Sequence, residues 1–177
     1  EYTVASVEPG NNKVYDDDEI MDITKTKPGE VHNKSQVTAD AQTVEKGYSD
    51  SGYINANVEP QVTLDKENKT THVVQQVNEG DLKYVKEITV TGNEVTRDVV
   101  VRREIFLNPG ERFDGGLLEA SHRRLECSEY YDAIRFSTED VVDDPLHSNL
   151  LVDVEEVKTS FFNFGAGYNT DEGIGGY

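Results

Sequence analysis

Four histidines are the side chains of this sequence best suited to metal or acid–base chemistry. They are spread along the chain, and none lies in a metal-ligand spacing such as His-Glu-x-x-His. We therefore expect them to be surface or strand residues. The four are His32, His72, His122 and His147.

Asp16 begins a run of four acids that ends at Glu19. A calcium loop needs the pattern D-x-[DN]-x-[DN]-G, which this run lacks. Acids are favourable at the start of a helix, where the helix dipole is positive. The run therefore predicts a helix N-terminus and no metal site.

Gly165-Ala166-Gly167 resembles only part of a dinucleotide fingerprint, because the third glycine and the surrounding strand and helix are missing. The sequence thus predicts no catalytic residue, no metal and no cofactor. An acidic enzyme domain with a carboxylate metal site is the alternative from a different class, and calorimetric titration with divalent metals discriminates it.

The composition excludes other classes of partner. The 177 residues hold 17 Lys+Arg against 35 Asp+Glu, a formal net charge of −18. Such a chain repels nucleic acid and anionic membrane surfaces. The hydrophobic share of 35% favours two small cores over one large core. The single cysteine, Cys127, excludes an intrachain disulfide, and we expect it to be a half-buried helix residue.

Two short motifs recur in the same order, which predicts an internal repeat. Gly10-Asn11 recurs 82 positions later as Gly92-Asn93, and Pro28-Gly29-Glu30 recurs 81 positions later as Pro109-Gly110-Glu111. A fixed period indicates one structural unit used twice. We expect one unit over residues 1–80 and a second over residues 81–158.

The first unit is predicted to be β-α-α-β-β. A strand over residues 2–7 precedes a helix that begins at the acidic run, and a second helix carries an apolar stripe. Residues 54–64 alternate between apolar and polar and predict a strand with one buried face, paired with a strand over residues 71–77. Pro60 places the first of these strands at a sheet edge. The helix stripe comprises Val37, Ala41, Val44 and Tyr48.

The second unit repeats this order. Residues 84–90 predict a strand, Thr96 a helix cap, and Val101 with Ile105 one face of the first helix. Asp114 is expected to cap the next helix, whose stripe is completed by leucines and a serine. The closing strands carry Ile134 with Phe136, and then Leu150, Val152 and Val154.

The tail differs from both units in composition. Phe162, Phe164, Ala166 and Tyr168 alternate with glycine and asparagine, a pattern typical of a transmembrane β-barrel strand. We expect residues 159–177 to be the truncated start of such a barrel.

Three stretches carry a family resemblance. Val85 to Asn93, followed by Val101-Arg102-Arg103-Glu104, is similar to the opening strand, turn and first helix of the last periplasmic POTRA (polypeptide-transport-associated) repeat of the outer-membrane β-barrel assembly family. Pro28-Gly29-Glu30 and Gly52-Tyr53 resemble the penultimate repeat, and residues 162–168 resemble the entry into the barrel. One departure is Glu129, which stands where the family has a glycine, so a positive φ there is strained.

The resemblance implies an α+β fold of two tandem POTRA domains, each a three-stranded mixed sheet covered by two helices. It implies a location at the periplasmic face of the bacterial outer membrane and a role in receiving unfolded β-barrel precursors. The implied partners also include assembly-complex lipoproteins and periplasmic chaperones. The alternative within the superfamily is a two-partner secretion or translocation transporter.

The resemblance also implies a binding site on the second strand of each repeat. An exposed strand edge can bind an extended peptide through its main chain. A hairpin strand that binds nothing is the alternative. The residues on these edges are Ala56, Val58, Val62, Leu64, Ile134 and Phe136. Arg102, Arg103 and Glu104 are expected to form a partner-facing helix patch, or else to be paired on the helix surface.

Overall fold

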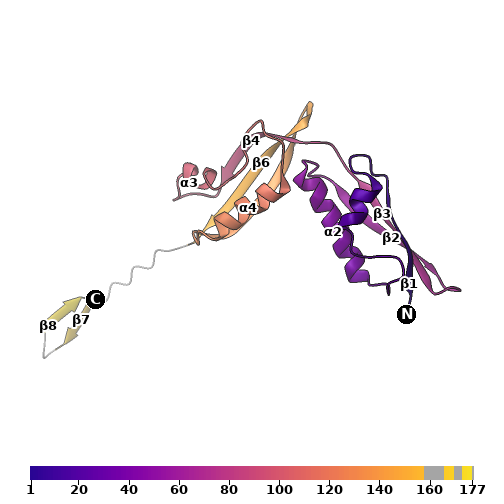
Figure 1. Ribbon diagram of the computed structural model, residues 1–177. Coiled ribbons are helices and arrows are strands. Elements are labelled where there is room, and N and C mark those ends of the chain that lie inside the picture. The colour runs from indigo at the N-terminus through magenta and orange to yellow at the C-terminus, as the bar shows by residue number, and fades with distance from the viewer. Residues whose placement is uncertain (158–165, 170–172, 177) are drawn as a thin grey trace.

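The computed structural model describes residues 1–157, 166–169 and 173–176, which form two similar domains and a short C-terminal hairpin (Figure 1). The first domain contains β1 (Thr3–Gly10), α1 (Asp17–Ile23), α2 (Lys34–Asp50), β2 (Asn57–Asp65) and β3 (Thr70–Asn78). The second contains β4 (Tyr84–Thr91), α3 (Asp98–Arg102), α4 (Gly115–Glu126), β5 (Tyr131–Val141) and β6 (Asp144–Glu156). The predicted β-α-α-β-β order is confirmed in both.

Each domain is a three-stranded mixed sheet. The strand order is β1-β3-β2 in the first domain and β4-β6-β5 in the second. The central strand pairs parallel with the first strand and antiparallel with the second. A parallel pair needs a long crossover connection, which the two helices of each domain supply. The second strand of each domain is therefore a sheet edge, as predicted.

Helix α2 follows the predicted stripe. Asn33 caps it by accepting hydrogen bonds from the backbone N–H groups of Ser35 and Gln36. All four stripe residues are buried: Val37, Ala41, Val44 and Tyr48. Burial of a valine side chain such as Val37 or Val44 stabilises the fold by about 1.5–3 kcal/mol. In the second domain, Asp114 caps α4 through the N–H of Leu117, as expected.

The start of α3 differs from the prediction. Its N-cap is Arg97, without a side-chain cap, and Ile105 follows the helix as a buried loop residue. Thr96 lies before this N-cap, and its N–H donates to the carboxylate of Glu156, 2.6 Å away. That bond keeps Thr96 in the loop after β4.

The strand expected over residues 54–64 begins only at Asn57. Ala56 precedes it in a turn, with its N–H bonded to the carbonyl of Tyr53. Ile54 packs against the core of the second domain instead of pairing in a sheet. This tertiary contact overrides the local alternation.

Two expectations about the end of α4 have opposite outcomes. Glu129 adopts a φ of 58°, so the family's glycine position keeps its left-handed backbone here. Cys127 is exposed, which corrects the expected half-burial, because it is the C-cap of α4 and not one of its core-facing residues.

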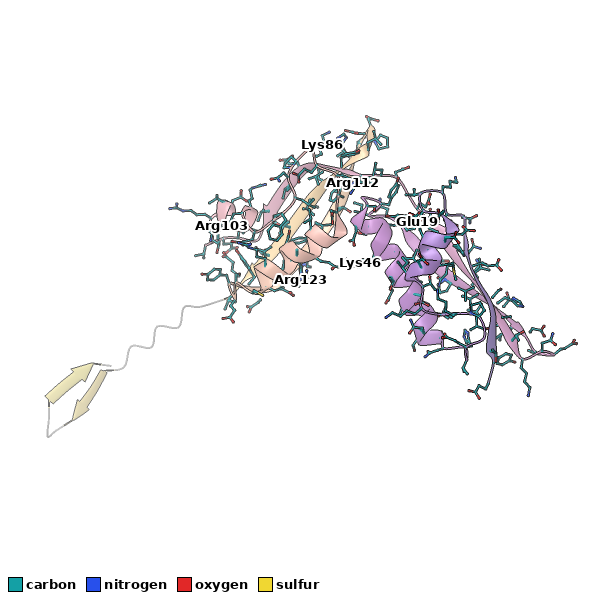
Figure 2. All side chains as sticks on the ribbon, in the orientation of Figure 1. Glu19, Lys46, Lys86, Arg103, Arg112 and Arg123 are labelled. Carbon is teal, nitrogen blue, oxygen red and sulfur yellow. The ribbon has the colours of Figure 1, made fainter. Side chains whose placement is uncertain are left out.

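The last turn of α2 joins the two domains. Lys46 reaches Glu119 of α4 at 3.2 Å, and it lies between the two helices (Figure 2). The carbonyl of Gly52 accepts a hydrogen bond from the N–H of Lys83 at 3.0 Å. At Gly115, a Cβ would lie 2.3 Å from the Oγ of Ser49, so any larger residue there must displace the Ser49 side chain.

Candidate functional site: the open strand edges

The outer strands β2 and β5 each pair with a neighbour on one side only (Figure 1). The opposite edges, β1 and β4, are partly covered. Val4 exchanges hydrogen bonds with the backbone of Glu30 and Gly29, and Val85 does the same with Glu111 and Gly110. The more open edges of the two sheets are therefore those of β2 and β5.

The backbone groups of β2 alternate between the sheet and solvent. The N–H of Val58 does not enter the ladder but donates to Oε1 of Glu45 on α2, 2.8 Å away. Val58, Pro60, Val62 and Leu64 therefore direct their backbone groups outward. Pro60 has no N–H, which explains why a proline is tolerated in this strand.

On β5, as on β2, every second residue directs its backbone N–H and C=O groups away from the sheet. Nε2 of His122 on α4 lies 3.1 Å from the carbonyl oxygen of Ile134. A carbonyl oxygen only accepts, so Nε2 is the donor. This places the backbone groups of Ile134 on the outer side, and those of Phe136, Thr138 and Asp140 with them.

The predicted edge residues differ in exposure. Val62 is 39% exposed and Leu64 52%, whereas Val58 is 4% exposed and packs in the first core. Helix α2 covers only the start of β2, so the second half of the strand is exposed on both faces. The prediction of one continuously buried face is therefore wrong for that half. Ala56 lies outside the strand and lines a groove of about 290 Å³ between α2 and α4. Ile134 and Phe136 are half-buried against the second core.

The residues of the expected helix patch form ion pairs with neighbouring side chains. Arg102 is the last residue of α3 and pairs with Asp98, while Glu104 accepts from both Arg103 and Arg124. The guanidinium of Arg124, assisted by Arg103, lowers the pKa of Glu104 below its ordinary value although burial opposes this. The surface ion pairs of the alternative interpretation are therefore present.

The sequence prediction missed Arg124, which belongs to this surface. Arg124 bridges from α4 and also lies over the ring of Phe106, 5.4 Å from its centroid. Figure 2 labels Arg103, which directly follows α3, and Arg123 of α4, which pairs with Glu119. All seven arginines of the chain lie in the second domain, between positions 97 and 135. This clustering of arginines in the sequence could have indicated a basic surface on the second domain.

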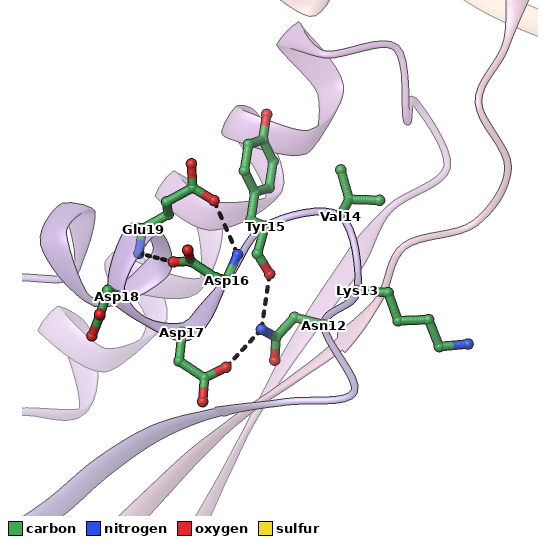
Figure 3. A pocket seen from close by; sticks show the side chains of 8 residues that line it. All are labelled: Asn12, Lys13, Val14, Tyr15, Asp16, Asp17, Asp18 and Glu19. Atoms are coloured by element: carbon green, nitrogen blue, oxygen red, sulfur yellow. Dashed lines mark hydrogen bonds between the residues drawn. The ribbon is translucent and has the colours of Figure 1, made fainter.

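The acidic run forms a capping box, as Figure 3 shows. Asp16 accepts from the N–H of Glu19, and the Glu19 side chain accepts from the N–H of Asp16. Asn12 donates to Asp17 and to the carbonyl of Tyr15. The carboxylates thus hold a helix start. Among the described residues, no group of three or more potential metal ligands lies close together.

The expected barrel strand falls largely outside the described residues. Phe162 and Phe164 belong to that part of the chain. Tyr168 lies in β7 (Ala166–Asn169), whose backbone pairs antiparallel with β8 (Gly173–Gly176). In the described segments, no helix has the length and apolar character needed to cross a membrane.

A family model identifies both units. The model for POTRA, described as "Surface antigen variable number repeat", matches residues 2–80 and again residues 83–157. The chain belongs to the POTRA family. The two matches coincide with the two sheets, so each POTRA repeat is one of the domains above.

Curated relatives carry the same repeats. The outer membrane protein assembly factor BamA of Neisseria meningitidis is 30% identical over 156 residues, which is 88% of this chain and 20% of that protein. BamA of Buchnera aphidicola is 28% identical over 154 residues, 87% of this chain and 25% of that protein. The chain thus spans about a quarter or less of these relatives' length.

Solved structures show the same fold. The BamA POTRA3-5 structure from Haemophilus influenzae has a TM-score of 0.82 at 18% identity, covering 88% of this chain and 61% of the other. BamA from Haemophilus ducreyi lacking POTRA domains 1-3 has a TM-score of 0.77 at 24% identity, covering 98% and 33%. At these identities the likeness supports the tandem POTRA fold.

Proposed function

We propose that this POTRA pair is the periplasmic, barrel-proximal part of an outer membrane protein assembly factor. In this role it binds extended segments of unfolded β-barrel precursors by strand addition to β2 and β5. The observation that carries the proposal is the open edge of each sheet, where main-chain groups point outward; on β2 they lie beside the exposed side chains of Val62 and Leu64. The names of the BamA relatives support the assembly role.

Strand addition suits a receptor for many precursors. Main-chain hydrogen bonds do not depend on the side chains of the bound strand, and barrel strands share an alternating pattern. On β2, Val62 and Leu64 offer both outward N–H and C=O groups next to apolar side chains. The binding requires no catalytic group and no cofactor, and the net charge of −18 disfavours nucleic acid.

The rest of the chain has further roles in this proposal. Residues 1–80 and 81–158 correspond to the penultimate and last repeats, and residues 159–177 begin the barrel that anchors the protein in the outer membrane. The patch of Arg102, Arg103 and Glu104, extended by Arg124, docks assembly-complex lipoproteins. Periplasmic chaperones deliver precursors to the same domains.

A backbone amide NMR titration tests the edge site. The probe is a blocked peptide of about ten residues copied from a barrel strand, which matches the length of such strands. We expect shifts in residues 62–65 and 136–140. No shifts at millimolar peptide in either strand would contradict strand addition and leave accessory-protein docking as the function. Binding of only one peptide sequence would favour a dedicated secretion transporter.

Proline variants provide the matched control. Val62→Pro removes an outward N–H without removing a bond to β3, just as Pro60 does naturally. We expect it to weaken peptide binding at β2 while the shifts in β5 persist. Equal binding by this variant would show that the peptide does not use the β2 main chain.

A further inference from the structure

Each open edge is blocked at the same position by a side chain from the helix beside it. In the first domain, Glu45 of α2 bonds to the backbone of Val58, and in the second, His122 of α4 bonds to that of Ile134. Val58 pairs with Val77, and Ile134 pairs with Val154. Val77 and Val154 are 77 positions apart, the same spacing as the equivalent central-strand residues Thr71 and Ser148, so Val58 and Ile134 occupy equivalent positions in the two sheets.

The two blocking groups differ in chemistry. A carboxylate accepts, so Glu45 occupies the N–H of Val58, whereas the imidazole donates and occupies the carbonyl of Ile134. His122 is also held in place by an edge-to-face contact with Phe136, with ring centroids 5.6 Å apart at 77°. Its Nδ1 lies 3.5 Å from Glu126. Both side chains thus satisfy edge groups that an added strand needs.

We infer that Glu45 and His122 set the register of strand addition, because they close the start of each edge and leave only its hairpin half open. This inference rests on the proposed function. On β2 the open part comprises Val62 and Leu64, since Pro60 also lacks an N–H. On β5 it runs from Phe136 to Asp140. A bound strand therefore docks on the hairpin half of each edge, away from the segment that enters the strand.

Amide hydrogen exchange in the free protein tests the block on β2 without any ligand. We expect the amide of Val58 to exchange more slowly than those of Val62 and Leu64. Glu45→Ala should speed exchange at Val58 about tenfold, the effect of losing one ordinary hydrogen bond. Glu45→Gln keeps an acceptor oxygen and should preserve protection. Unchanged exchange at Val58 in Glu45→Ala would overturn the inference.

The peptide footprint tests the register. With the barrel-strand peptide, the wild-type protein should show no shift at Val58, whereas Glu45→Ala should extend the shifts to that residue. His122→Phe keeps the aromatic packing on Phe136 but removes the donor, so the footprint on β5 should extend to Ile134. Identical footprints in wild type and variants would overturn the register claim.

The two proposals fail differently. If no peptide binds to any variant but Val58 loses its protection in Glu45→Ala, strand addition is wrong and Glu45 is still an edge cap. If peptide binds with the same footprint throughout, strand addition stands and the control of register by Glu45 and His122 is wrong.

Discussion

The two domains share one backbone plan and complete it with different side chains. Val4 and Val85 form backbone hydrogen bonds to the loops before the second helices, and Asn33 and Asp114 cap those helices. The two members of each pair are 81 positions apart in the sequence. After the helices the spacing falls to 77, because Val4 pairs with Thr71 while Val85 pairs with Ser148. The comparison teaches that the domains diverge at the end of the second helix.

The divergence has a structural use. Helix α2 has 17 residues and α4 has 12, and the extra length of α2 carries Lys46 and Ser49, which meet the second domain. The additional turn of α2 therefore contacts the second domain, whereas α4 lacks this turn. The additional residues at the end of α2 are therefore the part of the first repeat that contacts the second domain.

Three equivalent positions show the same need met by different chemistry. The turn after the first strand uses Asn11 with φ 65° in the first domain and Gly92 with φ 82° in the second. The segment after the first helix is held by buried Asp40 in one and buried Ser121 in the other. The central strand buries Gln75 in one and Val152 in the other.

The largest effect is expected at Gly92. A Cβ there would lie 1.9 Å from the carbonyl oxygen of Val154, so Gly92→Ala must displace β6. We expect the second domain to lose about 3 kcal/mol or more of unfolding free energy. The equivalent Asn11→Gly should change the first domain by less than about 1 kcal/mol. Denaturation followed by the amide signals of each domain measures both, and equal losses would break the comparison.

Acid should distinguish Asp40 from Ser121. Burial alone raises the pKa of Asp40, but hydrogen bonds from Thr26, Lys25 and Gln36 outweigh it and lower the pKa below its ordinary value. A carboxyl with a lowered folded-state pKa stabilises above its unfolded pKa of about 3.9, and this contribution is lost as pH falls through the folded value.

We therefore expect Asp40→Ser to cost the first domain about 2 kcal/mol at pH 7 and less at pH 2, because the stabilisation by the charged carboxylate declines as the pH falls toward the lowered folded-state pKa. Urea denaturation at both pH values measures the difference. A cost that is the same at both pH values would show that Asp40 acts through packing and not through its charge.

Gln75 is expected to be a liability. Its side chain is fully buried, and neither amide atom has a hydrogen-bond partner among the described residues. Gln75→Val should stabilise the first domain by about 1–2 kcal/mol, and Val152→Gln should destabilise the second by a similar amount. Thermal or chemical unfolding measures both. A loss of stability in Gln75→Val would indicate that the amide is satisfied by a buried water.

The smallest effect is expected at the junction. Gly115→Ala pushes against Ser49 and should cost about 1 kcal/mol of unfolding free energy, with amide shifts at the end of α2. Gly47→Ala is the control, because a Cβ there meets nothing closer than Ile23 Cδ1 at 3.9 Å. It should stabilise α2 by about 0.5–1 kcal/mol. If the amide chemical shifts at the end of α2 are the same in Gly115→Ala as in the wild type, the close approach of Gly115 to Ser49 does not contribute to the junction.

Local patterns determined the order of the elements and most of the core. The helical stripe of α2, the cap Asp114 and the turns before the second helices depend on residues a few positions apart. Such patterns are visible in the printed sequence because the periodicity of a helix or strand is local. The repeat was also visible in the sequence, but the match of Gly10-Asn11 with Gly92-Asn93 is off by one position. In the structure Asn11 and Gly92 are the equivalent residues, because both have a positive φ in the turn after the first strand.

Only the tertiary structure decided which edge groups are open. The sequence named Val58 and Ile134 as binding residues, but side chains from the neighbouring helices occupy their backbone groups. It also placed Ala56 in a strand that Ile54 leaves to join the other domain's core. These outcomes depend on contacts between distant residues and on backbone parity across a sheet, and no periodicity within a single segment encodes them.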